Sequence, residues 1–268
     1  MPQIFAHRGL SSTYPEMTRA AYRAAIEWAG RTGTPLGLEC DVHFSADDQL
    51  VCLHDLTLNR TAARPVRVFD LTVAQLKQID FGSWLQVDPS PDQQEMLTLA
   101  ELLSMTAEAR LAGVPVSVSI ETKHPNPRAL DIEERVAEML TAVGWDLAGS
   151  PVRLISFSLA ALERLGWLLP AVPRTLLVEH DLGPWRDGVL PEGLHVVAPS
   201  LSLLHEDPGF VGRALARGNQ VHAWTVNSAA DMRFCRDLGV TGFTTDYPEV
   251  ARQVLAEAPA DTRVLASV

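Results

Sequence analysis

Eight short apolar runs recur along this chain of 268 residues, and they restrict its fold more than any other feature. Each run has the length and composition of a buried strand, and together they cover residues 3–6, 36–41, 114–120, 152–157, 174–178, 195–198, 220–226 and 242–245. Helical spacing over residues 19–31, 130–143 and 160–169 separates several of them. Eight parallel strands joined by helices are the number that closes into a barrel, so we predict an α/β fold of the TIM (β/α)8 type.

The length of the chain suits one barrel domain over residues 1–268, because barrels of this type reach that size as a single unit. An apolar fraction of 47% is sufficient for a large core, and no Gly/Ser-rich linker divides the chain. Residues 56–95 fit no barrel unit. We therefore expect them to form a small insertion after the second strand and its hairpin, with a short helix over residues 73–80.

A net charge of −11 argues against nucleic acid and anionic membranes as partners, since both require a basic face. No apolar run is long enough to span a bilayer, and no secretory leader is evident, so we expect no stable membrane insertion and a cytoplasmic location. Cys40 and Cys52 lie on the two hairpin strands but not opposite each other, which argues against a disulfide and agrees with a reducing compartment. The oligomeric state is not indicated.

Three carboxylates stand at the carboxyl ends of predicted strands. Glu39 and Asp41 are two residues apart on one strand, so their side chains share a face. They could belong to a solvated edge, but their apolar surroundings favour a buried site. Glu121 follows the strand over residues 114–120 and could instead pair only with Lys123. An all-oxygen set suits Mg²⁺ or Ca²⁺, so we predict that Glu39, Asp41 and Glu121 hold one divalent cation.

Two histidines accompany these carboxylates. His7 follows the first strand and precedes Arg8, while His54 follows the hairpin strand. If Asp47 and Asp48 form a two-residue hairpin loop, Asp41 lies directly opposite His54, with Cβ atoms roughly 5 Å apart. Either histidine alone would more readily be a core residue. Beside an arginine and the carboxylates, the pair favours acid–base catalysis.

The chain resembles the glycerophosphodiester phosphodiesterase family in a series of motifs that keep the family's order and cover nearly its whole length. These include His7-Arg8-Gly9, Pro15-Glu16-x-Thr18, Glu39-x-Asp41, His54-Asp55, Asn59-Arg60-Thr61, Glu121-x-Lys123, Trp224-Thr-Val-Asn227 and Thr245-Asp246-Tyr-Pro248. One position departs from the family pattern, because Met17 stands where these proteins usually carry asparagine. A small change in substrate positioning is therefore expected, without loss of activity.

The resemblance implies metal-dependent hydrolysis of a small-molecule phosphodiester to sn-glycerol 3-phosphate and an alcohol. In such proteins the neighbouring hydroxyl of the substrate attacks phosphorus and gives a cyclic phosphate that water then opens. Arg8 and Lys123 would bind phosphate oxygens, and Trp224 would form a wall of the pocket. We assign His7 as the base and His54 as the acid.

Two alternatives remain open at this point. A phospholipase D-like lyase would use the same site on lysophospholipids and stop at the cyclic phosphate. It would need an apolar approach to the pocket, for which residues 182–190 with Trp185 are the candidate. A non-catalytic barrel that binds phosphate esters is the other alternative, and loss of a histidine or a ligand carboxylate would have favoured it.

Overall fold

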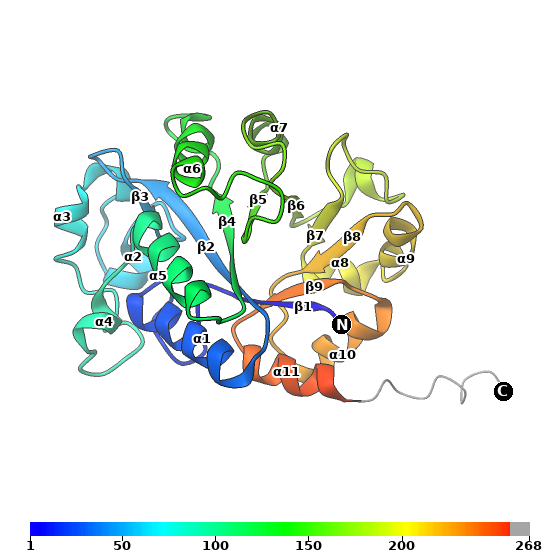
Figure 1. Ribbon diagram of the computed structural model, residues 1–268, viewed down its shortest axis with the longest axis horizontal. Helices are drawn as coiled ribbons and strands as arrows, with labels where there is room; N and C mark the ends of the chain where they lie inside the picture. The colour runs from blue at the N-terminus through cyan, green and yellow to red at the C-terminus, as the bar shows by residue number, and fades with distance from the viewer. Residues whose placement is uncertain (258–268) are drawn as a thin grey trace.

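A computed structural model describes residues 1–257 and shows a closed barrel of parallel strands (Figure 1). The strands are ordered β1-β9-β8-β7-β6-β5-β4-β2, and β1 also pairs with β2, which closes the ring. The predicted TIM (β/α)8 barrel is therefore confirmed. Its strands are β1 (Gln3–Ala6), β2 (Leu36–Phe44), β4 (Val116–Thr122), β5 (Val152–Ser156), β6 (Arg174–Val178), β7 (Val196–Pro199), β8 (Gln220–Ala223) and β9 (Gly242–Thr245).

Helices surround the strands (Figure 1). The ring consists of α1 (Arg19–Thr32), α5 (Leu99–Leu111), α6 (Asp131–Ala142), α7 (Leu159–Leu168), α8 (Leu201–Glu206), α9 (Gly209–Ala216), α10 (Ala229–Leu238) and α11 (Pro248–Ala256). The connection from β6 to β7 carries only the 3-10 turn η2 (Gly183–Trp185). Glycine and proline in this segment explain the missing helix, because neither supports a helix interior.

Local sequence sets the ends of the first helix. The Thr18 side chain accepts a hydrogen bond from the backbone N–H of Ala21 and caps the start of α1. Gly33 ends the helix in the left-handed conformation, with φ of 65°, where glycine carries no Cβ penalty. One face of α1, including Tyr22 and Trp28, is buried against the barrel. These signals place α1 where the sequence predicts it.

The hairpin after β2 differs from our prediction by one residue. Strand β3 (Leu50–Cys52) pairs antiparallel with β2 in a register that joins Val42 to Cys52. The Ser45 N–H donates to the Gln49 carbonyl at 2.9 Å and extends the pairing by one residue beyond each strand end, so the loop holds three residues, 46–48, rather than two. Asp48 closes this loop with a left-handed φ of 60°. The carbonyl of Asp41 accepts from the N–H of Leu53, so the predicted pairing of Asp41 with His54 is wrong.

Residues 56–95 add no strand to the barrel and form short turns and helices beside it: α2 (Asn59–Ala62), η1 (Val68–Asp70), α3 (Val73–Leu76) and α4 (Pro91–Gln94). The helix predicted over residues 73–80 is limited to α3, which starts at a capping box between Thr72 and Gln75. A second apolar cluster, which includes Leu58, Leu76 and Phe81, holds this segment against β3.

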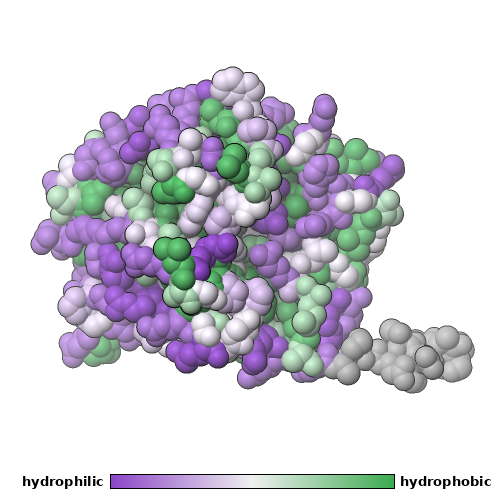
Figure 2. Space-filling model, in the orientation of Figure 1, coloured by the Kyte–Doolittle hydropathy of each residue, from purple (hydrophilic) through white to green (hydrophobic). Residues whose placement is uncertain are grey.

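The main core lies between the barrel and its helices, as expected for this architecture. The face in Figure 2 mixes polar and apolar residues, in keeping with the acidic composition. Across residues 1–257, none of the helices is both long enough and apolar enough to cross a membrane. Cys40, Cys52 and Cys235 are buried free thiols.

Candidate active site

A cavity of about 750 Å³ opens at the carboxyl ends of the barrel strands. This is the end at which barrel enzymes place their chemistry. All the residues that the sequence assigns to the site line this one cavity: His7, Arg8, Glu39, Asp41, His54, Glu121, Lys123 and Trp224. Although the predicted hairpin register is wrong, His54 still lines the cavity, because the chain turns toward the cavity after β3.

Three buried carboxylates converge in the cavity. Glu39 and Asp41 lie on β2, and Asp41 is the register neighbour of Glu121 on β4. One oxygen from each carboxylate lies within 4.8 Å of the others, the arrangement of a metal centre. The parallel pairing of β2 with β4 therefore produces the cluster, since it aligns two residues that are 80 positions apart in the sequence.

Two cations contact the carboxylates. The Lys123 ammonium donates to Asp41 Oδ1 at 2.8 Å and to Glu121 Oε1 at 2.7 Å. Arg8 Nε lies 3.4 Å from Asp41 Oδ2, outside hydrogen-bonding geometry. The backbone N–H of Arg8 donates to Glu39 Oε2 at 2.9 Å. Arg8 adopts a left-handed φ of 57°, an uncommon conformation for a side chain of this size.

The three carboxylates of this cluster are all ionised only with the help of a further cation. Burial, together with the nearby charge of Asp41, raises the pKa of Glu121 to about 8. Burial and Asp41 likewise hold the pKa of Glu39 well above its usual range. Burial would also raise the pKa of Asp41, but Lys123 and Arg8 outweigh it and lower that pKa. With all three carboxylates ionised, as metal ligands must be, they carry one negative charge more than Lys123 and Arg8 neutralise, and Asp41 Oδ2 has no hydrogen-bond partner. The cluster therefore fits a divalent metal ion.

His7 is held by a carboxylate from the last strand of the barrel. Its Nδ1–H donates at 2.6 Å to Oδ1 of Asp246, the residue immediately after β9. Asp246 also accepts from Ser11 and from the side chain of Asn227. Burial would raise the pKa of Asp246, but His7, Ser11 and Asn227 together outweigh it and lower that pKa, so Asp246 stays ionised. This arrangement fixes the imidazole and leaves Nε2 as its free nitrogen.

His54 is held in the same way. Its Nδ1–H donates to Asp55 Oδ1 at 2.6 Å, and His43 contributes a ring nitrogen 3.1 Å from the carbonyl of His54. Burial lowers the pKa of His54, although the negative charge of Asp41 opposes the shift. The sequence places Asp55 in a family motif but gives it no role. The position of Asp55 directly after His54 was the signal in the sequence that could have indicated this role.

A chain of ion pairs connects the two histidine regions. Arg60 donates to Asp55 at 2.8 Å and to both oxygens of Glu16 at 2.7 Å. Glu16 in turn accepts from Arg8 at 2.9 Å. Sequence reasoning assigned no function to Glu16 or Arg60, since their contact spans 44 positions and follows no local pattern.

Met17 and His124 lie at the edges of this site. Met17 is buried with a left-handed φ of 58°, and it does not line the cavity, so the departure from asparagine affects the support of the site. His124 lines the cavity and contacts Glu133 Oε1 at 2.9 Å. Glu133 is fully buried on α6, and sequence reasoning gave it no role.

The opposite side of the cavity is apolar. Its wall comes from β5 to β8 and includes Ile155, Leu177 and Trp224. The indole N–H of Trp224 donates to the carbonyl of Ala198 at 2.8 Å, which fixes the ring. Trp185, on η2, also lines the cavity. The pocket thus has a charged half and an apolar half.

Buried acids, two carboxylate-held histidines and two basic side chains at this end of a parallel barrel define a barrel enzyme. The sequence profile described as "Glycerophosphoryl diester phosphodiesterase family" matches residues 7–250, and the chain belongs to this family. The resemblance seen in the motifs is thereby confirmed.

Relatives agree over almost the whole chain. A Mycobacterium tuberculosis protein named "Probable glycerophosphodiester phosphodiesterase 1" is 34% identical over 254 residues, which cover 92% of this chain and 90% of that protein. A Bacillus subtilis protein named "Glycerophosphodiester phosphodiesterase" is 29% identical over 262 residues, covering 93% and 85%. The structure of an Oleispira antarctica phosphodiesterase in complex with the product sn-glycerol-3-phosphate superposes with a TM-score of 0.78 at 25% identity, covering 96% and 98%.

Proposed function

We propose that this enzyme hydrolyses glycerophosphodiesters to sn-glycerol 3-phosphate and an alcohol with the help of one divalent cation. The observation that carries the proposal is the meeting of the buried carboxylate cluster with two carboxylate-held histidines in one cavity. The product bound by the Oleispira antarctica relative is of the same chemical class. We expect residues 1–268 to act as one domain with the insertion at residues 56–95, in a cytoplasmic setting.

Glu39, Asp41 and Glu121 would hold the metal ion, and Mg²⁺ and Ca²⁺ both suit their oxygen ligands. When bound, the ion supplies positive charge that polarises the phosphoryl group. Arg8 and Lys123 line the same half of the cavity and add positive charge toward the phosphate oxygens. These groups thereby make the local charge that faces the phosphate positive, although the chain as a whole is acidic.

Proton transfer falls to the two histidines. His7 Nε2 accepts the proton of the substrate hydroxyl next to the phosphate, and that oxygen attacks phosphorus. His54 Nε2 donates a proton to the departing alcohol, which leaves a cyclic phosphate. Water then opens the ring with the histidine roles reversed, so both return to their starting states. Asp246 accepts the Nδ1–H of His7 and leaves its Nε2 free to take a proton, whereas His54 starts as the imidazolium, whose Nδ1–H is bound by Asp55 and whose Nε2–H is the proton that it donates.

Product analysis tests the proposal. Purified protein is incubated with glycerophosphocholine, glycerophosphoethanolamine and glycerophosphoglycerol, and sn-glycerol 3-phosphate is measured by a coupled dehydrogenase and by phosphorus NMR. We expect the same phosphate product from each diester, loss of turnover with chelator, and recovery with Mg²⁺ or Ca²⁺. Full turnover in metal-stripped protein, or release of a phosphorylated head group, contradicts the proposal.

A lyase acting on lysophospholipids is a second candidate, and the apolar half of the cavity with Trp185 is the observation that favours it. Lysophosphatidylcholine would then give free choline and a stable cyclic phosphate. The same phosphorus NMR assay detects that product, since the cyclic phosphate has a distinct shift. A non-catalytic barrel is the weaker reading, because both histidines and all three carboxylates are present.

A further inference from the structure

The apolar half of the cavity has a composition of its own. Strands β5 to β8 and η2 supply Ile155, Phe157, Leu177, Val178, Trp185 and Trp224. Within residues 1–257, Arg8 and Lys123 are the basic side chains, histidines aside, that line the cavity, and both contact residues of the charged half. A substrate group placed against the apolar wall therefore meets no lysine or arginine.

Aromatic rings dominate this wall. Phe157 and Trp224 meet edge to face, with ring centroids 5.3 Å apart and planes at 81°. Phe157 is 39% exposed, so its ring is accessible to a ligand. Because the indole N–H of Trp224 is already bonded to Ala198, this ring offers its π surface rather than a polar contact. Trp185 adds a third aromatic ring from another segment.

Two acidic side chains line the same cavity as these rings. Glu179 and Asp181 both line the cavity directly after β6. Asp181 is committed, since it accepts from the Gly183 N–H at 2.9 Å and from Arg186 at 3.1 Å. Among residues 1–257, the one basic group within ion-pair distance of Glu179 is His180, at 3.4 Å. Glu179 therefore provides the negative charge that these two acids offer to a ligand.

We propose that the aromatic wall and Glu179 form a subsite for a cationic alcohol head group, with a quaternary ammonium such as choline as the best fit. This inference rests on the proposed function, because the head group is the alcohol that leaves the diester. Aromatic rings attract such cations through their negative faces, and the methyl groups of a quaternary ammonium suit apolar surroundings. A primary ammonium makes poorer use of the wall because it requires hydrogen bonds.

The charge distribution supports the same choice. The charged half of the cavity takes the phosphate, and Glu179 lines the cavity after β6, so a zwitterionic diester meets a complementary charge at each end. A head group with a carboxylate or a second phosphate would face Glu179 within a protein of net charge −11. Both Glu179 and the net negative charge of the protein therefore disfavour anionic head groups.

One pair of substrates isolates the cation. In the 3,3-dimethylbutyl diester of glycerol 3-phosphate, carbon replaces the quaternary nitrogen of glycerophosphocholine with nearly the same shape. We expect kcat/KM for glycerophosphocholine to exceed that of the neutral isostere by about 3- to 30-fold, the range that cation–π attraction covers. Glycerophosphoethanolamine should lie between glycerophosphocholine and glycerophosphoserine.

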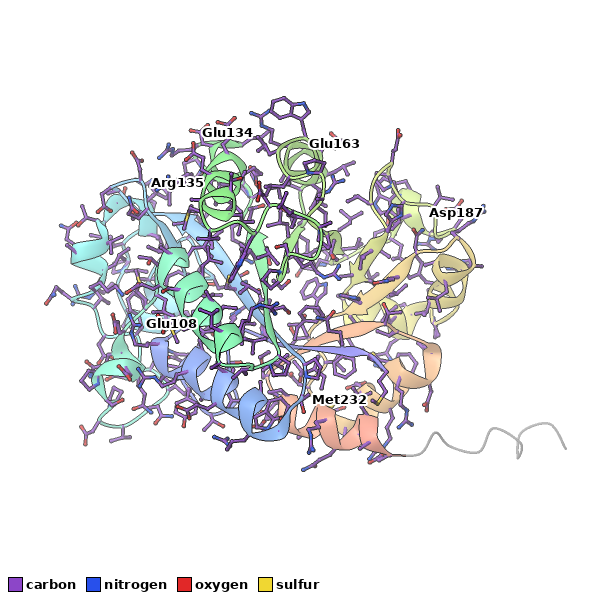
Figure 3. All side chains as sticks on the ribbon, viewed as in Figure 1. Glu108, Glu134, Arg135, Glu163, Asp187 and Met232 are labelled. Carbon is purple, nitrogen blue, oxygen red and sulfur yellow. The ribbon has the colours of Figure 1, made fainter. Side chains whose placement is uncertain are left out.

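Two variants assign the effect to the subsite. Trp185→Leu and Glu179→Gln should each reduce the ratio between glycerophosphocholine and its isostere at least threefold, mainly through KM. Matched controls are Trp167→Leu, an exposed tryptophan at the end of α7, and Asp187→Asn, an acid of the same β6–β7 connection that stands at the outer margin of the molecule (Figure 3). Neither control residue lines the cavity, so both should keep the wild-type ratio.

Equal or faster turnover of the isostere overturns the inference and assigns the wall to alkyl groups. Calorimetric titration of both diesters into chelated protein provides a readout that needs no catalysis. If the protein turns over no diester yet binds glycerophosphocholine more tightly than the isostere, the proposed function fails and the subsite stands. If it hydrolyses all diesters without preferring the cation in either measurement, the subsite fails and the function stands.

Discussion

The Lys123 ammonium lies 2.8 Å from Asp41 Oδ1 in the buried floor of the cavity. Burial would lower the pKa of Lys123, but the charges of Asp41 and Glu121 raise it above its usual range, so this lysine stays charged. Asp41 is thereby compensated before any metal ion binds. Glu39 is not compensated to the same degree, since its pKa is raised by burial and by Asp41. The cost of assembling the metal site therefore falls on Glu39 and on Glu121, whose pKa values are both raised.

Replacing Glu39 by glutamine should separate stability from activity. At pH 7.5 in chelator, the free energy of unfolding of Glu39→Gln should exceed that of wild type by about 1–3 kcal/mol. The reason is that the change removes a buried carboxyl group whose charge is poorly compensated. The folded-state pKa of Glu39 lies above the unfolded value, so this advantage should grow as the pH rises above about 4.5. Thermal melts and urea titrations measure it.

The same variant should lose turnover, and Mg²⁺ or Ca²⁺ should no longer raise its melting temperature as it does for wild type. Glu163→Gln is the control, since Glu163 is an exposed residue on α7 outside the cavity (Figure 3). A chelated Glu39→Gln protein that is less stable than wild type would show that the carboxylate contributes to the fold through its contact with the Arg8 backbone.

The two histidine variants test the division of roles. His7→Ala and His54→Ala should each lower kcat by a factor on the order of 10² to 10⁴, the usual range for a positioned acid or base. A diester with a good leaving group, such as a nitrophenyl ester, needs little help from an acid. Turnover of that substrate should recover in His54→Ala and stay low in His7→Ala. Recovery in His7→Ala instead would exchange the two assignments.

His222 should make the protein acid-sensitive. It is buried on β8, and burial, aided by the charge of Arg153, lowers its pKa to about 3. The unfolded chain binds a proton near pH 6.5 whereas the folded chain does not, so stability is present above pH 6.5 and is lost as the pH falls toward 3. At pH 5 the loss from this group amounts to about 2 kcal/mol.

Urea unfolding between pH 4.5 and 7.5 checks this expectation through the slope of the free energy of unfolding against pH. His222→Leu should flatten the slope, whatever its effect on absolute stability. His180→Gln alters a histidine whose side chain is 85% exposed and should keep the wild-type slope. An unchanged slope in His222→Leu would assign the acid sensitivity to other groups.

Much of the fold was readable from the sequence because buried parallel strands have continuous apolar runs. The strands 174–178 and 242–245 have the bounds that the sequence predicts, and the polar residues that follow strand ends meet in one cavity. The hairpin register was not readable. It depends on Asp48 adopting a left-handed conformation, and aspartate permits that conformation without requiring it.

Long-range polar contacts were equally hidden. Glu16 and Arg60 meet only because the insertion folds back beside the first βα connection, and no spacing rule connects positions 44 apart. His124 and Glu133 are closer in sequence, but their contact depends on where α6 begins. The motifs therefore named residues that the fold brings together in one cavity, while the partners that orient the histidines emerged from the fold.

The last prediction concerns the nucleophile. Among the residues that line the cavity in the described part of the chain there is no serine or cysteine, so a protein hydroxyl or thiolate of these types cannot attack phosphorus. The proposed mechanism instead uses the hydroxyl of the substrate next to the phosphate as the nucleophile. A diester that lacks this hydroxyl should bind with nearly normal affinity and react very slowly. One missing hydrogen bond accounts for about 1 kcal/mol, a few-fold in rate, so a loss of 10³-fold or more would identify the hydroxyl as the attacking group.

Rapid-quench detection of a cyclic phosphate from the natural diester gives an independent check. Comparable turnover of the deoxy and natural diesters would mean that water attacks directly, and His7 would then be the base that activates water.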